Sequence, residues 1–211
     1  MRLQSSIVKR LVFYIIGLNF IAVAVVLNIR YNLGVAAFAS VMYAASSVYR
    51  ISLGTASIIC YLLFVLVQCI LSKKLTLLYV LEIPFSFAFG FLTDFYDWLV
   101  PDFTVSLPVG VILFLLTMFL TALGVYLYVN ADFIMIPTEG VVKTIADVFR
   151  LRFSLVKNLF DLSLVVISVL LCVLNRAPLY GIGAGTVLSA VCIGRIIKLY
   201  ESFLHISEKT Q

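Results

Sequence analysis

Charged residues are scarce in this 211-residue chain: Asp, Glu, Lys and Arg together make up 12% of it, whereas hydrophobic residues make up 64%. Soluble globular domains carry about 25% charged residues, so the composition excludes that class and indicates a protein of the lipid bilayer. The net charge of +5 follows from basic loops beside apolar stretches. We therefore expect no nucleic-acid partner.

Histidine occurs once, as His205, and the four cysteines include no Cys-x-x-Cys pair. These counts exclude a histidine proton relay within the membrane, and neither a metal cluster nor a disulfide framework is indicated. The glycine-rich run from Gly181 to Gly185 lacks the Gly-Lys-Ser/Thr that completes a nucleotide-binding loop. We expect no cofactor and no catalytic residues, because no nucleophile and base pair is visible, and hence no enzyme.

Long apolar stretches predict an all-α fold, a polytopic membrane helix bundle. A stretch of about 20 apolar residues is long enough to cross the hydrocarbon core of a bilayer. Six stretches qualify: Leu11–Ile29, Gly54–Leu71, Leu75–Leu92, Leu107–Val129, Leu155–Leu174 and Gly181–Leu199. Two shorter segments, 33–49 and 133–149, hold equivalent places after the first and fourth stretches, and we expect them to be re-entrant or interfacial helices.

The positions of Lys and Arg favour six spans with both termini in the cytoplasm, because basic residues gather on that side. This arrangement leaves only Arg30, Arg50 and Arg176 outside, and it places the acidic segment 94–102 in an outer loop. The alternative is eight spans, with the two short segments crossing fully. That model moves the basic 73–74 pair outside and buries Lys143 within a span.

The order of apolar stretches and polar breaks occurs twice, over residues 11–99 and 107–203, within a single membrane domain of 1–211. Arg50-Ile51-Ser52-Leu53 recurs as Arg152-Phe153-Ser154-Leu155, which gives an offset of 102 residues. Each half holds three spans, an odd number, so the second half is expected to be inverted relative to the first. Inverted repeats of this kind are common in secondary transporters.

Ionisable residues inside apolar spans are the candidate functional groups, because they are costly there and face the protein interior. Glu82 lies about midway through the third expected span, close to Pro84, which can kink a helix. Asp161 shares a helical face with Lys157 and Asn158. A structural Lys157–Asp161 pair at the cytoplasmic interface is an equally good interpretation of that face.

The second short segment is the most polar part of the chain between two apolar spans. Pro137 suits the first turn of a helix, and Glu139 and Lys143 are spaced to pair on one face. A structural ion pair is the favoured interpretation. The alternative is a re-entrant helix whose first turn offers free backbone donors to an anion.

The sequence resembles the YczE/YitT group of bacterial integral membrane proteins over nearly its whole length. The resemblance rests on Gly17 and Asn28, on Leu33-Gly34-Val35-Ala36, on Ser52-Leu53-Gly54 and on Gly183-Ala184-Gly185-Thr186. It implies a multi-pass protein of the bacterial cytoplasmic membrane with a transport role. The chain departs from the pattern at Ala36 and Ala37, where a proline is expected.

The favoured function is a small secondary transporter or permease for a small molecule or ion, working alone or as a homodimer. Its substrate-binding residues are predicted to be Glu82, Glu139, Lys143, Asn158 and Asp161. The alternative is a membrane accessory or regulatory subunit that transports nothing and stabilises a partner complex.

Overall fold

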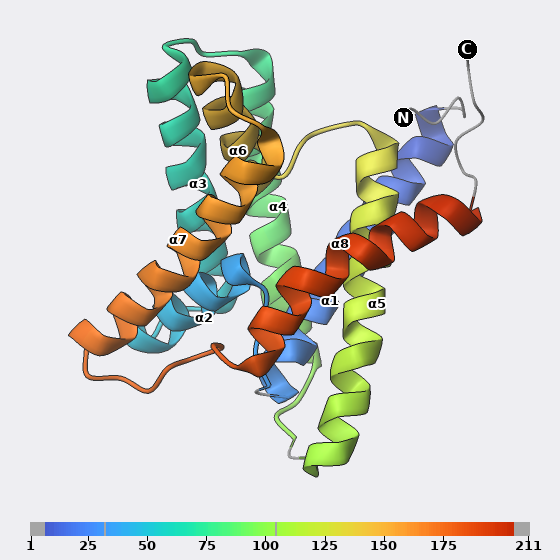
Figure 1. The fold of residues 1–211 in the computed structure, drawn as a ribbon, viewed down its shortest axis with the longest axis vertical. Helices are drawn as coiled ribbons and strands as arrows, with labels where there is room; N and C mark the ends of the chain where they lie inside the picture. The colour runs from blue at the N-terminus through green and yellow to red at the C-terminus, as the bar shows by residue number, and fades with distance from the viewer. Residues whose placement is uncertain (1–6, 32, 104, 205–211) are drawn as a thin grey trace. The chain divides into compact units, whose positions relative to one another are not determined.

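The computed structural model describes residues 7–31, 33–103 and 105–204, and within them every regular element is a helix (Figure 1). The expectation of an all-α membrane bundle is confirmed. The described residues form eight helices: α1 (Ile7–Tyr31), α2 (Ala37–Tyr49), α3 (Leu53–Ser72), α4 (Leu77–Leu99), α5 (Leu107–Ala131), α6 (Pro137–Phe149), α7 (Phe153–Leu174) and α8 (Ala184–Leu204).

Five of these helices, α1, α3, α4, α5 and α7, are long and apolar enough to cross a membrane. Each of them overlaps one of the first five expected spans. The sixth expected span corresponds to α8, which carries Arg195, Lys198 and Glu201 in its sequence, and its crossing stays a prediction. The long helices present large apolar side chains outward, as Ile59, Leu63, Leu66 and Ile70 do on α3.

Helix α4 extends seven residues past the expected span end at Leu92, to Leu99. Asp94 and Asp97 are therefore helical, and the expectation that 94–102 is a loop throughout is wrong. The helix also continues through Pro84 without a break. Both acidic residues have partners that hold them: Asp94 caps a neighbouring helix, and Asp97 pairs with Arg30.

The two short segments form helices α2 and α6, of 13 residues each. At 1.5 Å per residue such a helix is about 20 Å long, shorter than the roughly 30 Å hydrocarbon core. Each ends in the same way, with a residue in the left-handed conformation: Arg50 with φ 55° and Arg150 with φ 54°. In each, the backbone N–H of that arginine donates to a carbonyl in the last turn of the helix.

Corresponding helices of the two halves begin 100 residues apart, at Ala37 and Pro137 and at Leu53 and Phe153. The offset of 102 residues taken from the Arg50 and Arg152 matches is therefore wrong for these helices. Arg50 instead corresponds to Arg150, which has the same backbone conformation. The fourth helices, α4 and α8, begin 107 residues apart, at Leu77 and Ala184.

The chain divides into two compact units, and each unit combines segments from both halves of the sequence. Unit 1 draws on Met1–Val35, Tyr96–Phe133 and Gly183–Gln211, and unit 2 on Ala36–Phe95 and Ile134–Ile182. The compact units therefore do not follow the repeat boundaries 11–99 and 107–203.

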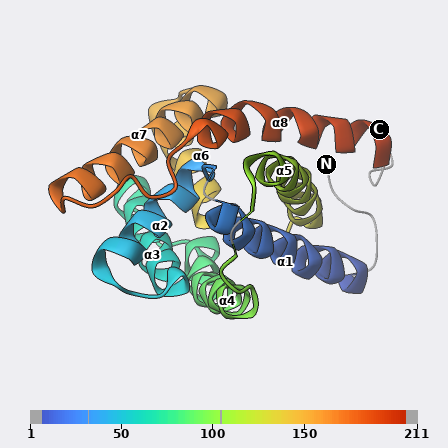
Figure 2. The ribbon, with the colours of Figure 1, turned by 90° about the horizontal axis from the view of Figure 1, so that it is seen from below.

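In unit 1, α1 and α5 lie side by side (Figure 2). They cross at Gly17 and Gly124 and run antiparallel, because the start of α1 contacts the end of α5. A methyl group on Gly17 would lie 2.7 Å from the carbonyl oxygen of Gly124, so only glycine permits this approach. Arg10 of the first turns of α1 donates to the carbonyl of Ala131 at the end of α5, 2.9 Å away. Since α1 and α5 hold equivalent places in the two halves, this antiparallel packing is what an inverted repeat predicts.

Arg30, at the end of α1, is one of the three basic residues that the six-span arrangement places outside. Its guanidinium lies 2.8 Å from a carboxylate oxygen of Asp97 and 3.1 Å from one of Asp102. It also donates to the carbonyl of Val100. The charge is thus neutralised by acidic residues in the last turn of α4 and just after it.

We predict that Gly17→Ala lowers the free energy of unfolding by about 1–3 kcal/mol, because the added methyl overpacks a backbone contact. The measurement is thermal unfolding of the purified protein in detergent. Gly194→Ala is the matched control, since a Cβ there meets nothing within 4 Å. Equal melting temperatures for the two variants would contradict the close α1–α5 crossing.

Candidate functional site

Unit 2 is held together by the short helices, with α2 packed against α7 and α3, and α6 against α3 and α7. Helix α4 is fastened to α3 by Asp94. Its carboxylate accepts hydrogen bonds from the hydroxyl of Ser52 at 2.7 Å and from the backbone N–H of Gly54 at 2.6 Å. Ser52 is itself the N-cap of α3, and an acidic group at a helix N-terminus is stabilised by the helix dipole.

Further along the same helix pair, Glu82 of α4 meets Gln68 of α3 in the interior. The Gln68 side-chain amide donates to Oε2 of Glu82 at 2.7 Å. Gln68 is 0% exposed and Glu82 2% exposed. Glu82 is the sixth residue of α4, so it lies nearer the start of this helix than the expected position midway along a span.

Helix α6 brings Gly140 directly over this pair. A methyl group on Gly140 would lie 2.7 Å from Oε1 of Glu82 and 2.8 Å from Oε1 of Gln68. The second oxygen of the carboxylate and the amide oxygen therefore converge on the same face of the glycine. Among the described residues, Oε1 of Gln68 has no hydrogen-bond partner.

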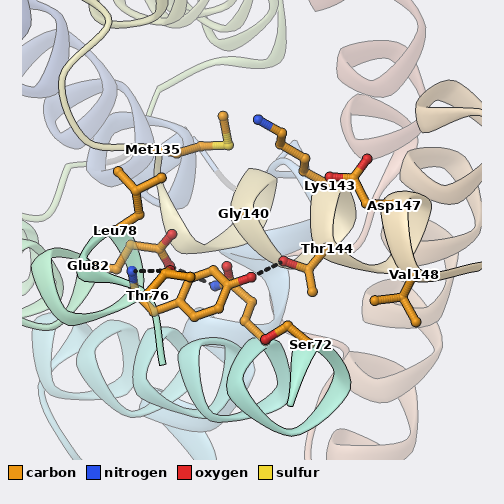
Figure 3. Close-up of a pocket in the computed structure, with 12 residues that line it drawn as sticks. Ser72, Thr76, Leu78, Glu82, Met135, Gly140, Lys143, Thr144, Asp147 and Val148 are labelled. Carbon is orange, nitrogen blue, oxygen red and sulfur yellow. Dashed lines mark hydrogen bonds between the residues drawn. The ribbon is translucent and has the colours of Figure 1, made fainter. Parts of the chain in front are cut away.

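These residues border a cavity of about 270 Å³ between α3, α4 and α6 (Figure 3). Its lining consists of Gln68, Ser72, Thr76, Leu78, Tyr79, Glu82, Met135, Gly140, Lys143, Thr144, Asp147 and Val148. The hydroxyls of Tyr79 and Thr144 lie 3.2 Å apart across it. Lys143 and Asp147 are exposed, whereas Gln68 and Glu82 are buried, so the cavity leads from a charged mouth to a polar interior.

Of the five predicted site residues, Glu82 and Lys143 line this cavity. Glu139 is half-buried, and its carboxylate accepts a hydrogen bond from the hydroxyl of Thr138 at 2.8 Å. The expected Glu139–Lys143 ion pair is wrong: among the described residues the structure has salt bridges for other pairs only. Figure 3 shows the Lys143 ammonium extended toward Met135 instead.

Asn158 and Asp161 lie on α7 and do not line the cavity. Asp161 pairs with Lys157, whose ammonium is 2.9 Å from its carboxylate, and Asn158 is exposed. This geometry matches the alternative interpretation, a structural Lys157–Asp161 pair. The structure therefore does not bring the five residues together.

Sequence reasoning missed Gln68 and Gly140, which complete the buried part of the site. One signal was available for Gln68, since a glutamine within an apolar span is a polar group that needs a partner. Gly140 gave no signal, because its role depends on the approach of α6 to two side chains far away in the sequence.

Residues 8–202 match a protein family that is described as a family of unknown function, DUF6198. The chain belongs to this family. No curated protein and no solved structure matches the chain. The match extends from α1 into α8, so the candidate site lies within the part of the chain that matches the family. The resemblance to the YczE/YitT group stays a prediction.

We predict that Gln68→Leu in this DUF6198 protein lowers the free energy of unfolding by about 1–3 kcal/mol, because it leaves a buried carboxylate without its donor. Asn158→Leu is the control, since that side chain is exposed, and it is expected to leave the melting temperature unchanged. Melting in detergent measures both. A Gln68→Leu protein as stable as the wild type would contradict the hydrogen bond to Glu82.

Proposed function

We propose that this protein is a small secondary transporter or permease of the bacterial cytoplasmic membrane, and that the cavity of unit 2 is its substrate site. The observation that carries the proposal is the buried Glu82 carboxylate. It lies on a membrane-length helix, borders a cavity and has no salt bridge among the described residues.

Burying an ionised carboxylate costs several kcal/mol unless a counter-charge and further hydrogen bonds compensate. Among the described residues, the Glu82 carboxylate is compensated by a hydrogen bond from one neutral amide, that of Gln68. A purely structural position would be served better by an apolar side chain of similar volume. Ionisable groups retained within membrane helices mark substrate and ion pathways, which supports transport.

The cavity size limits the substrate. A water molecule occupies about 30 Å³ in the liquid, and ligand pockets for drug-sized molecules start at about 300 Å³. A cavity of about 270 Å³ therefore suits an ion with bound water or a molecule of a few heavy atoms. Energy for its movement would come from an ion gradient or from the substrate's own gradient.

The proposal includes both termini in the cytoplasm and a homodimer as one form of the working unit. Antiparallel packing of α1 and α5 supports an inverted arrangement of the two halves. Pairing of Arg30 with Asp97 and Asp102 supports an outer location for the end of α4 and the segment after it, because it neutralises a basic charge that is unfavourable on that side.

We predict that the purified protein binds and takes up at least one compound from a panel of alkali and ammonium salts, amino acids, nucleosides and carboxylic acids. Binding is measured by thermal shift in detergent, and uptake with the radiolabelled compound in proteoliposomes. Glu82→Gln is expected to abolish uptake, because it removes the charge from the cavity, whereas Ser163→Ala on the exposed face of α7 keeps it. A folded, monodisperse protein that takes up nothing would favour the accessory-subunit function.

Cysteine labelling in intact bacteria tests the orientation. In a background with Cys60, Cys69, Cys172 and Cys192 replaced by alanine, we predict that Asp102→Cys reacts with a membrane-impermeant maleimide. Lys74→Cys is expected to react only after the cells are broken. Eight spans would reverse the two results, because the α3–α4 turn would then face outward.

A further inference from the structure

We propose that Glu82 Oε1 and Gln68 Oε1, converging over Gly140, form a binding site for a small monovalent cation. The role of this cation, as the transported or coupling ion, rests on the proposed function. The existence of the site rests on the geometry alone.

The first step is the hydrogen-bonding capacity of the two side chains. An ionised carboxylate only accepts hydrogen bonds, and the amide oxygen of glutamine also only accepts. Both Oε1 atoms lie within 3 Å of where a Cβ on Gly140 would stand, and the Gln68 nitrogen, which is engaged by Oε2 of Glu82, lies 3.1 Å from the same point. Two acceptors aimed at one point repel each other unless a positive or proton-bearing group lies between them.

The orientation of the Gln68 amide is fixed by Glu82. Exchanging its oxygen and nitrogen would place the amide oxygen 2.7 Å from Oε2 of the carboxylate, an acceptor against an acceptor. When Glu82 is ionised, the amide nitrogen must therefore face it. Its oxygen is left pointing at Gly140, buried and without a partner among the described residues.

The equivalent contact between α2 and α7 shows that the fold does not require this arrangement. With the offset of 100 residues, Ser168 of α7 corresponds to Gln68, and Ser40 of α2 corresponds to Gly140. There the hydroxyl of Ser168 donates to the carbonyl of Ser40 at 3.0 Å, and both side chains are buried. The same helix-to-helix contact is thus made with a neutral, satisfied hydrogen bond, so the acceptor pair at Gln68 serves another purpose.

Charge around the site favours a cation over an anion. The titratable groups that line the cavity with Glu82 are Tyr79 on its own helix and Lys143 and Asp147 on α6. Glu139 of α6 acts on Glu82 electrostatically, and α3 contributes the neutral Gln68 and Ser72. Lys143 is exposed, and the described structure gives it no salt bridge to Glu82. The first turn of α6 meets acceptor oxygens, so the alternative of an anion at this helix N-terminus loses its support.

A single buried carboxylate suits a single positive charge. Ca²⁺ takes six to eight oxygen ligands, usually including several carboxylates, and Mg²⁺ demands a near-octahedral set. The occupant is therefore an alkali ion, an ammonium ion or a proton on Glu82 that is donated to the Gln68 oxygen. Each of these occupants places one positive charge between the two acceptor oxygens, and the experiment distinguishes them.

The experiment measures the melting temperature of the full chain in detergent, in choline chloride, while NaCl, KCl, LiCl or NH₄Cl replaces choline at constant ionic strength. We expect one of these salts to raise the melting temperature saturably, because binding to the folded state stabilises it. The rise is expected to be lost in Glu82→Gln and in Gly140→Ala, whose methyl would lie within 3 Å of both oxygens and displace them. It is expected to persist in Ser168→Ala at the equivalent position.

If the occupant is a proton, the salts act alike, and the wild-type melting temperature depends on pH in a way that Glu82→Gln abolishes and Ser168→Ala preserves. A wild-type protein whose response to both salts and pH equals that of Glu82→Gln overturns the site. Should Glu82→Gln not fold, Gly140→Ala decides in its place. Cation binding without uptake in proteoliposomes would retain the site and reject the transporter, so the two proposals fail separately.

Discussion

A charge placed among apolar helices must find a partner, and this requirement organises the protein. Arg30 is neutralised by Asp97 and Asp102 where α1 and α4 end, and Lys157 pairs with Asp161 on α7. Asp94 takes the positive end of α3 as its partner through the Gly54 N–H. Because unpaired charges are costly to bury, these partners determine where helices end and which helices lie together. Glu82 departs from the pattern, since its described partner is a neutral amide.

The repeat helps to interpret this departure, because equivalent contacts within the protein can be compared with each other. Contacts of α3 with α6 and of α2 with α7 are equivalent by the offset of 100 residues, and both lie in unit 2. One has a carboxylate, an orphaned amide oxygen and a cavity; the other has a Ser168–Ser40 hydrogen bond. Two halves that share a backbone plan thus differ in chemistry at matching positions. Packing explains what they share, and the proposed ion site is our explanation for what they do not share.

The lengths of the apolar stretches were sufficient to locate most helices from the sequence, because the backbone polar groups of a membrane span must hydrogen-bond within the span itself. The expected span 54–71 differs from α3 by one residue at each end, and 155–174 differs from α7 only at its start. The same reasoning failed at Asp94 and Asp97. Their polarity indicated a loop, but contacts with Gly54 and Arg30 stabilise both residues within helix α4. The predicted offset between the two halves was wrong by two residues, because Arg50 was matched to Arg152 on residue type alone. The residues that share a left-handed backbone conformation are Arg50 and Arg150.

The site was only partly predictable for a related reason. The cost of a buried carboxylate singled out Glu82, and that cost is a local property of the sequence. Helical spacing showed that Asn158 and Asp161 share a face, but spacing cannot say which face points inward. Gln68, Glu82 and Gly140 meet only because Asp94 fastens α4 to α3 and α6 packs across them. A functional site on such a protein is therefore a consequence of how its few charges are paired elsewhere, since those pairs fix the helices that leave one carboxylate and one amide oxygen facing a common space.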